Sequence, residues 1–297
     1  MFFRNLTVFR LTEPGVADDA LDQRLAAAAF RPCLSQEPRS SGWVAPLDGS
    51  PESLVHESGG ARLVCLQTEE RILPPAVLRD AVNQRAAERE AREDRRLRRG
   101  EKYQLRDELL LELLPRAFTQ RRRNHACFDG TWLVVDGAGG RAVGELTDML
   151  RKTLGSLPIA PPAVTDSPAA VMTGWLGDES LPAGLELGDE CELRDAEGVV
   201  RCKGQDLRGE EIRTHLQAGK QVVRLALRWD ERLECLLDED LTVRRLRFLD
   251  VVREPLDQID AADAVALFDA EFSLMIGELR RFLPTLLAWF GGETQRV

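Results

Sequence analysis

Residues 76–123 run AVLRDAVNQRAAEREAREDRRLRRGEKYQLRDELLLELLPRAFTQRRR, and this stretch decides how the fold is interpreted. Between Pro75 and His125 there are fourteen Lys and Arg against nine Asp and Glu. The whole chain carries 40 basic and 50 acidic residues, a net charge of −10. A uniformly solvated surface would not separate charge in this way. Segregated positive charge on an acidic protein predicts a polyanionic partner, of which nucleic acid is the commonest.

The same stretch predicts a projecting helical arm. After Val82, Leu97 is the only large apolar side chain of the first helix, which therefore cannot bury a wide stripe. We expect Gly100 to break or kink this helix and the leucine-rich segment Leu105–Leu114 to pack back against it. A solvated helix with Glu–Arg pairs four residues apart would explain part of the charge. It would leave the run Arg121–Arg123 unexplained.

Length and composition bound the rest of the chain. Its 297 residues suffice for two domains or for one core with an insertion, and 43% apolar with 30% charged residues is typical of a folded protein. No apolar run approaches the roughly 18–20 residues of a membrane helix, and the N-terminus lacks the basic-then-apolar order of a signal peptide. We therefore expect a cytoplasmic protein without membrane contact.

Several chemical motifs can be tested against the sequence. Six cysteines without a C-x-x-C pair and three dispersed histidines predict reduced, buried thiols and neither a metal nor a cofactor. The segment TWLVVDGAGGRA at 131–142 has the local pattern of a dinucleotide site, but a proline-rich segment stands where the second strand should follow. No phosphate-binding loop or hydrolase motif occurs. A metal-dependent nuclease built from scattered carboxylates stays an alternative.

Hydrophobic periodicity predicts an α+β fold with mixed or antiparallel sheets. Before the arm we expect a strand at 3–11, a helix at 16–30 and a strand at 62–67. After it we expect a hairpin at 126–135 and helices at 141–154, 169–176 and 209–218, with strand-and-turn structure at 184–201. An antiparallel meander over 221–229, 232–238 and 241–248 and a final helix at 261–290, interrupted near Pro284, complete the chain. A proline-rich linker at 158–168 suggests a central domain (1–74 and 126–165), a helical finger (75–125) and a base domain (166–297).

The meander carries arginines in alternating positions. Because side chains alternate across a strand, Arg224 and Arg228 should share one face of the first strand, and Arg245 and Arg247 one face of the third. The sequence leaves open whether this is a functional basic face or ordinary solvent exposure.

Long, idiosyncratic strings give the chain an end-to-end resemblance to the recombination-associated RdgC family of proteobacteria. The strings are FRNL at 3–6, VFRL at 8–11, FRPC at 30–33, GWVAP at 42–46, EERILP at 69–74, LLPRAF at 113–118, LRKTLGSLP at 150–158, QDL at 205–207, EEI at 210–212 and FDAEF at 268–272.

The resemblance implies an architecture and a function. Members of this family form ring-shaped homodimers around a positively charged hole wide enough for duplex DNA. The chain is therefore expected to bind double-stranded and also single-stranded DNA without sequence preference, to associate with the nucleoid, and to modulate RecA-dependent recombination negatively without catalysing a reaction. An acidic exterior around a basic channel would account for the charge segregation. The rival hypotheses are a dimeric protein-interaction scaffold, in which the arm serves dimerisation alone, and the nuclease.

The candidate DNA-binding residues have two sources. By resemblance, Arg116 and Phe118 match positions near a dimer contact and the channel, and Gln205 matches a channel position that many relatives precede with a basic residue. Here Lys203-Gly204 stands before it, which displaces that charge by one residue. The remaining candidates rest on charge alone, and they are Arg98, Arg99, Arg121, Arg122, Arg123, Arg224, Arg228 and Arg245.

Overall fold

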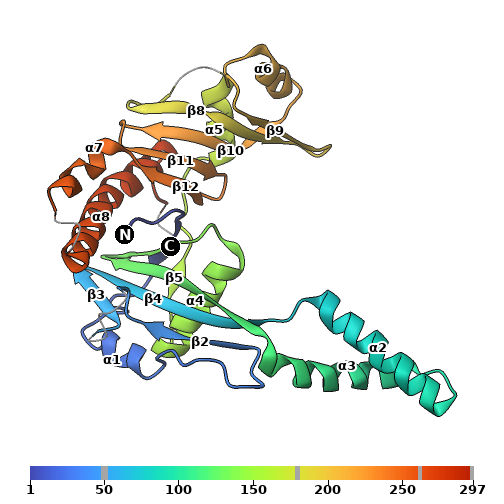
Figure 1. Cartoon of the computed structure of the whole chain (residues 1–297). Helices are drawn as coiled ribbons and strands as arrows, with labels where there is room; N and C mark the ends of the chain where they lie inside the picture. The colour runs from blue at the N-terminus through green and yellow to red at the C-terminus, as the bar shows by residue number, and fades with distance from the viewer. Residues whose placement is uncertain (48–52, 178–180, 260–262, 295–297) are drawn as a thin grey trace.

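Two antiparallel sheets form the body of the protein. The structure is a computed structural model, and it describes residues 1–47, 53–177, 181–259 and 263–294. The sheets lie one above the other in a C-shaped body that is open on one side, and a pair of helices projects from the lower sheet (Figure 1). The chain is thus an α+β protein with antiparallel sheets.

The first sheet has the strand order β2-β4-β5-β6-β1-β7, with β3 also paired to β4. Its strands are β1 (Thr7–Leu11), β2 (Arg39–Val44), β3 (Val55–Ser58), β4 (Ala61–Ile72), β5 (Phe118–Asp129), β6 (Trp132–Val135) and β7 (Ile159–Ala160). Helices α1 (Leu21–Ala26) and α4 (Gly140–Leu154) cover one face, where Leu25, Trp43 and Leu146 are fully buried. The predicted hairpin at 126–135 is confirmed, since β5 pairs with β6 across Asp129-Gly130.

The projecting arm consists of α2 (Pro75–Glu93) and α3 (Arg99–Leu113), followed by the short 3-10 helix η1 (Leu114–Arg116). The break falls at 94–98, where Asp94 adopts the left-handed conformation with φ 49°. Gly100 lies inside α3, so the expected break at that residue was wrong. A small core of Leu78, Leu97, Leu105 and their neighbours joins the two helices.

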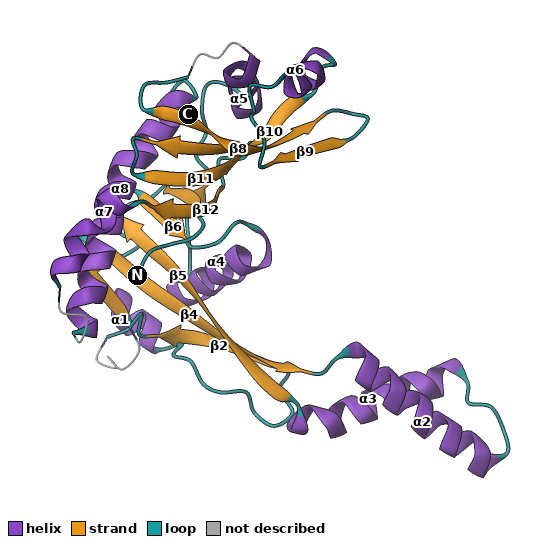
Figure 2. Ribbon diagram, turned by 45° about the horizontal axis from the view of Figure 1, so that its top comes forward, coloured by secondary structure: helices purple, strands orange, loops and turns teal. Residues whose placement is uncertain are grey.

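The second sheet has the order β12-β11-β10-β8-β9, and the predicted meander forms its first three strands. The strands are β8 (Leu185–Arg194), β9 (Val199–Lys203), β10 (Gln221–Trp229), β11 (Leu233–Asp238) and β12 (Val243–Phe248). The accompanying helices are α5 (Pro168–Gly177), α6 (Glu210–Gln217), α7 (Asp250–Arg253), the 3-10 helix η2 (Glu254–Gln258) and α8 (Ala264–Trp289) (Figure 2).

Two expectations about helices were wrong for identifiable reasons. Helix 16–30 shrinks to α1 because the next residues turn aside to bond Trp43 of β2, whose N–H donates to the Ala28 carbonyl at 3.0 Å. This approach requires glycine at position 42, since a Cβ there would lie 2.4 Å from the Phe30 Cα. The final helix continues through Pro284, because ten buried side chains hold it in place. Residues 261 and 262, its predicted start, lie outside the described residues.

Helix α8 holds the two sheets together. One core cluster includes Phe272 and Met275 of α8, Leu63 and Cys127 of the first sheet, and Leu225 of the second. The N-terminal segment, predicted to be strand from residue 3, enters its strand only at Thr7. Before that point the Leu6 N–H donates to the Val243 carbonyl at 2.7 Å and bridges to the second sheet. The two sheets therefore share one hydrophobic core.

Candidate nucleic-acid interface

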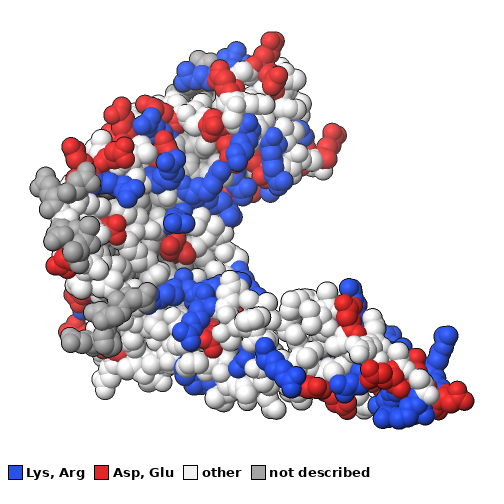
Figure 3. Space-filling model, in the orientation of Figure 1, with Lys and Arg blue, Asp and Glu red and all other residues white. Residues whose placement is uncertain are grey.

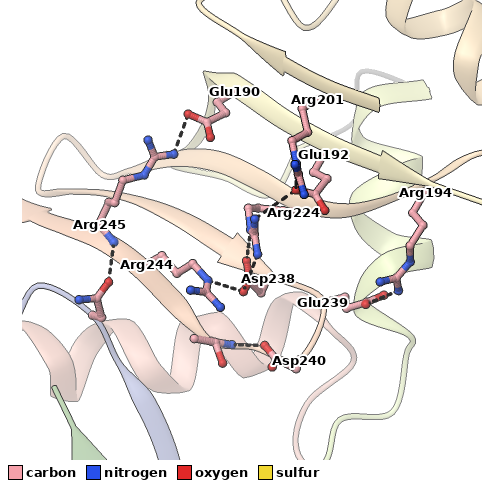
Figure 4. A network of polar contacts seen from close by, with 12 residues as sticks. Glu190, Glu192, Arg194, Arg201, Arg224, Asp238, Glu239, Asp240, Arg244 and Arg245 are labelled. Atoms are coloured by element: carbon pink, nitrogen blue, oxygen red, sulfur yellow. Dashed lines mark hydrogen bonds and ion pairs between the residues drawn. The ribbon is translucent and has the colours of Figure 1, made fainter. Parts of the chain in front are cut away.

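The second sheet turns one face to the hydrophobic core and presents a network of charged side chains on the other. Figure 4 shows that Arg201, Arg224 and Arg244, from three different strands, point toward one another over this polar face. On β10 the alternation leaves Arg224 and Arg228 on the polar side, while Leu225 and Leu227 are buried. The predicted placement of these two arginines on one face agrees with this pattern.

Asp238 organises the centre of the network. This carboxylate is 6% exposed, and it accepts hydrogen bonds from Arg224 and from Arg244 Nε at 2.5 Å. Glu192 accepts from Arg224 Nη1 at 3.2 Å and from Arg201 Nε at 2.8 Å. The bonds to Asp238 raise the pKa of the Arg224 guanidinium. Each guanidinium carries five N–H donors, so these arginines are held in fixed positions and keep donors for a further ligand.

A β-bulge brings Arg245 into the same network. Its φ of 50° lies in the left-handed region, and two residues of β12 face one residue of β11 here. The Arg245 side chain forms an ion pair of 2.7 Å with Glu190 of β8 (Figure 4). The bulge also shifts the alternation, so that Arg244 joins the polar face although simple period-two counting excluded it.

Three further candidates, on the second sheet and in the loop after β9, have weaker contacts with their neighbours. Arg228 lies 3.9 Å from Glu234, a distance at which the ion pair is weak. Lys203 is exposed and forms no ion pair with any described residue. Gln205 follows β9 with an exposed side chain, and its backbone N–H donates to the Asp189 carbonyl at 3.3 Å.

The run Arg121–Arg123 lies on strand β5 and not on the helical arm where the sequence placed it. A strand sends successive side chains to opposite faces, so the run is divided. Arg121 donates to Glu69 at 2.6 Å and lies over the Phe30 ring, and Arg123 donates to the Ala45 carbonyl at 2.6 Å. Two of the three arginines are therefore engaged by neighbouring protein groups.

Arg122 points to the opposite face and lines a cleft of about 210 Å³ between the sheet and α4. Arg39 and Arg141 line the same cleft, together with Asn124. Glu145 pairs with both of these arginines, whereas Arg122 contacts Gln120 at 3.4 Å and forms no ion pair with a described residue. The sequence gave no sign of this grouping, since the three arginines belong to β2, β5 and α4.

The tip of the arm is a separate basic cluster. Arg98 is exposed, and Arg99 donates to the Tyr103 hydroxyl at 3.1 Å. Arg95 is paired with Glu93 and Glu101. Arg92, Arg96, Arg98 and Arg106 form no ion pair within the described part of the chain. Figure 3 shows Lys and Arg side chains gathered at this end of the molecule.

Arg116 and Phe118 lie at the other end of the arm, where the finger joins β5. Arg116 ends η1 and is exposed, and Phe118 is 86% exposed at the first position of the strand. Its partner on β4, Ile72, is also exposed, and apolar side chains exposed side by side often mark a contact surface.

The structure gathers the candidates into three places instead of one. The second sheet holds Lys203, Gln205, Arg224, Arg228 and Arg245. The junction of finger and first sheet holds Arg116, Phe118 and Arg121–Arg123, and the finger tip holds Arg98 and Arg99. Figure 3 shows Lys and Arg along both edges of the opening of the C, on the second sheet and on the first-sheet side. Sequence reasoning missed Arg39, Arg141, Arg201 and Arg244.

The described residues also bear on two other kinds of site. They contain no group of three or more His, Cys, Asp or Glu side chains placed to hold a metal ion. Among the helices described, none has the length and apolar character to cross a membrane.

Comparison with known proteins covers nearly the whole chain. The family model described as "Putative exonuclease, RdgC" matches residues 1–293. The chain is 44% identical to the recombination-associated protein RdgC of Halorhodospira halophila, over 99% of both chains. It is 41% identical to the protein of the same name from Psychromonas ingrahamii, over 99% of both. It is also 38% identical to that of Proteus mirabilis, over 99% of this chain and 100% of the relative.

Proposed function

Because the chain belongs to the RdgC family, we propose that it binds DNA without sequence preference and acts in recombination without catalysing a reaction. Its relatives are named recombination-associated proteins, which supports a role on DNA. In this proposal the protein forms a ring-shaped homodimer, associates with the nucleoid in the cytoplasm, and limits RecA by occupying DNA.

The observation that carries the proposal is the placement of the arginines. The chain is acidic overall, yet Lys and Arg line both edges of the open side of the C (Figure 3). A local basic surface on an acidic protein attracts a polyanion to one place and repels it elsewhere. A second copy that closes the opening would enclose this surface as a channel.

Contacts to phosphates fit this surface better than contacts to bases. The sheet arginines are fixed by Asp238 and Glu192 and present their remaining N–H groups as a rigid array. Among the described helices beside the second sheet, we find no row of base-reading side chains, and phosphate contacts carry no sequence information directly. The same contacts would serve single-stranded DNA. The cleft of Arg39, Arg122 and Arg141 offers a second place for backbone phosphates.

The three-part division of the chain gives each part a role in the proposed ring. The base domain (166–297) and the central domain (1–74 and 126–165) would form the basic walls. The finger (75–125) would reach the partner subunit, with Phe118 and Arg116 at its root near the contact. A closed ring slides on a duplex and must open to load on a circular one.

The test is duplex binding over a salt series with matched neutral variants. A fluorescent duplex of scrambled sequence is titrated with the wild type, Arg228→Gln, Lys203→Gln and Arg281→Gln. Arg281 belongs to α8 on the side away from the opening, so its variant loses the same charge outside the proposed interface (Figure 1). Log affinity should fall with log salt by about 0.9 per phosphate contacted.

Loss of one phosphate contact should weaken binding to all sequences and reduce the salt slope by about one per altered side chain, hence by about two in a homodimer. Arg281→Gln should change neither quantity. A flat salt response, or equal effects of all three variants, would contradict a DNA surface on the open side. Sedimentation of the wild type tests the dimer separately.

The family description favours one alternative, a nuclease. A metal-dependent nuclease degrades the duplex when magnesium is added, whereas the proposed function leaves the duplex intact. The protein-interaction scaffold predicts weak DNA binding together with a stable dimer. Running the salt series with and without magnesium, followed by gel analysis of the DNA, separates the three.

A further inference from the structure

A pair of cysteines lies directly opposite on the last two strands of the second sheet. Cys191 of β8 and Cys202 of β9 are register partners in an antiparallel ladder. Both side chains belong to the core cluster on the underside of the sheet, opposite the charged network. Cys191 is 1% exposed and Cys202 is 9% exposed.

The geometry suits a covalent link between them. Directly opposed residues of an antiparallel pair have Cα atoms about 4.5–5.5 Å apart, and disulfides span Cα separations of about 4.4–6.8 Å. We propose that Cys191 and Cys202 form a reversible disulfide when the protein meets a peroxide oxidant.

The other cysteines show that this pairing is specific. The register partners of Cys65 are Val44 and His125, those of Cys127 are Leu63 and Val134, and Cys235 faces Leu227. Cys33 lies in a loop, where its N–H and thiol contact Glu69. Cys191 and Cys202 therefore form the one directly opposed cysteine pair among the named strands of the described residues.

The position of β9 provides access for the oxidant. It is the edge strand of the sheet, bonded to β8 alone within the sheet, and it leads into the short helix α6. Edge elements with few partners open locally more often than central strands do. Such opening exposes Cys202 first, because Cys191 lies one strand further in. Burial also raises the pKa of the Cys191 thiol to about 12, which keeps it protonated.

The chemistry balances with hydrogen peroxide as the sole oxidant. The Cys202 thiolate attacks one peroxide oxygen, the O–O bond breaks, and the products are a sulfenic acid on Cys202 and hydroxide, which takes up a proton to give water. The Cys191 sulfur then attacks the Cys202 sulfur, the S–O bond breaks, and the leaving hydroxide takes the Cys191 proton. Two thiols are oxidised by two electrons in total, and one peroxide is reduced to two waters.

The experiment measures thiols and needs no DNA, so its result is independent of the proposed function. The reduced full-length protein is treated with graded hydrogen peroxide, alkylated under denaturing conditions and mapped by mass spectrometry. The variants are Cys191→Ala and Cys202→Ala, with Cys235→Ala as a matched buried control from the same sheet. The partly exposed Cys33 reports on the dose of oxidant.

Besides any oxidation of Cys33, the wild type and Cys235→Ala should each lose the two thiols of Cys191 and Cys202, with one peptide link between positions 191 and 202 that dithiothreitol reverses. Cys191→Ala should instead accumulate a sulfenic acid on Cys202 that dimedone traps. The proposal is overturned if Cys33 is oxidised while both paired thiols are still alkylated, or if the recovered link joins any other cysteines. The wild-type map decides this even when a variant does not fold.

Discussion

At the scale of single residues, the important property of the charged sheet is that its arginines are held by acids. Sequence reasoning placed Arg224, Arg228 and Arg245 on strands, because period-two alternation is visible in the sequence. It could not find Asp238 as the shared acceptor, since that depends on which strands become neighbours. It also missed Arg244, because the bulge at Arg245 changes the alternation locally.

Replacing Asp238, the shared acceptor, should lower the stability of the protein and at the same time strengthen its binding to DNA. Asp238→Asn removes the charge that holds Arg224 and Arg244, so we expect a loss of about 2 kcal/mol in the free energy of unfolding. Arg244 loses its acidic partner and Arg224 keeps only Glu192, so the added positive charge should tighten duplex binding and steepen its salt dependence. Urea denaturation and the duplex titration measure the two effects.

Asp240→Asn is the matched control for that variant. Asp240 lies in the turn that follows β11, is exposed, and accepts a hydrogen bond from the Thr242 N–H at 2.9 Å. The substitution changes net charge by the same amount without releasing an arginine. Equal tightening by both variants would mean that net charge alone, and not the arginine network, governs affinity.

At the scale of helices and strands, strong local sequence patterns were enough to predict an element correctly. The Asp129-Gly130 hairpin, helix 141–154 and the C-terminal meander follow from turn residues and periodicity, and the structure confirms them. The arm shows the limit of such signals. Gly100 was expected to break the helix, but the chain instead turns at 94–98, where Glu90 accepts from the Leu97 N–H at 2.8 Å and Glu101 from the Arg98 N–H at 2.8 Å.

Glu101 should make the finger tip sensitive to acid. Its hydrogen bonds from Arg95 and from the Arg98 N–H lower its pKa to about 2. A lowered pKa stabilises the fold above the unfolded carboxyl value of about 4.3, and this contribution is lost as pH falls toward about 2. Glu101→Gln should remove it at every pH. Hydrogen exchange of residues 94–104, corrected for intrinsic rates, measures the loss of protection.

Glu108→Gln provides the comparison within the same helix. Glu108 is exposed on α3 and forms no ion pair with a described residue. We expect its substitution to leave the tip protected. Comparable deprotection in both variants would show that α3 responds to charge in general and not to this particular cap.

At the scale of the whole molecule, one core cluster spans both sheets and the finger has a smaller one of its own. The core that contains Leu6, Phe272 and Leu225 crosses from sheet to sheet, whereas the finger has its own cluster around Leu105. The proline-rich segment 158–168 suggested a division between domains. A shared core cannot be deduced from composition, because it depends on where α8 packs.

Two identical Leu→Ala substitutions should therefore destabilise different parts of the protein. Leu6→Ala, at a fully buried position of the shared core, should lower the free energy of unfolding by about 3 kcal/mol in a single transition. Leu105→Ala should leave that transition nearly unchanged and increase hydrogen exchange in α2 and α3. Urea denaturation followed by circular dichroism and by tryptophan fluorescence tests cooperativity, and non-coincident curves for Leu6→Ala would separate the sheets.

The paired strands β4 and β5 connect the finger to the rest of the protein, so their stiffness affects how far the finger can move. These strands pair continuously from Ala61↔Asp129 to Ile72↔Phe118, with β6 beside β5 from Ala126 to Asp129 and β2 beside β4 from Cys65 to Glu70, so that only the last two pairs extend beyond both neighbours. Beyond this short end, α2 forms a lever of about 28 Å. A bend of a few degrees at Arg71 and Ile72 therefore displaces Arg98 by an ångström or two. The stiffness of these paired strands, more than any contact at the tip, sets how far the finger can reach.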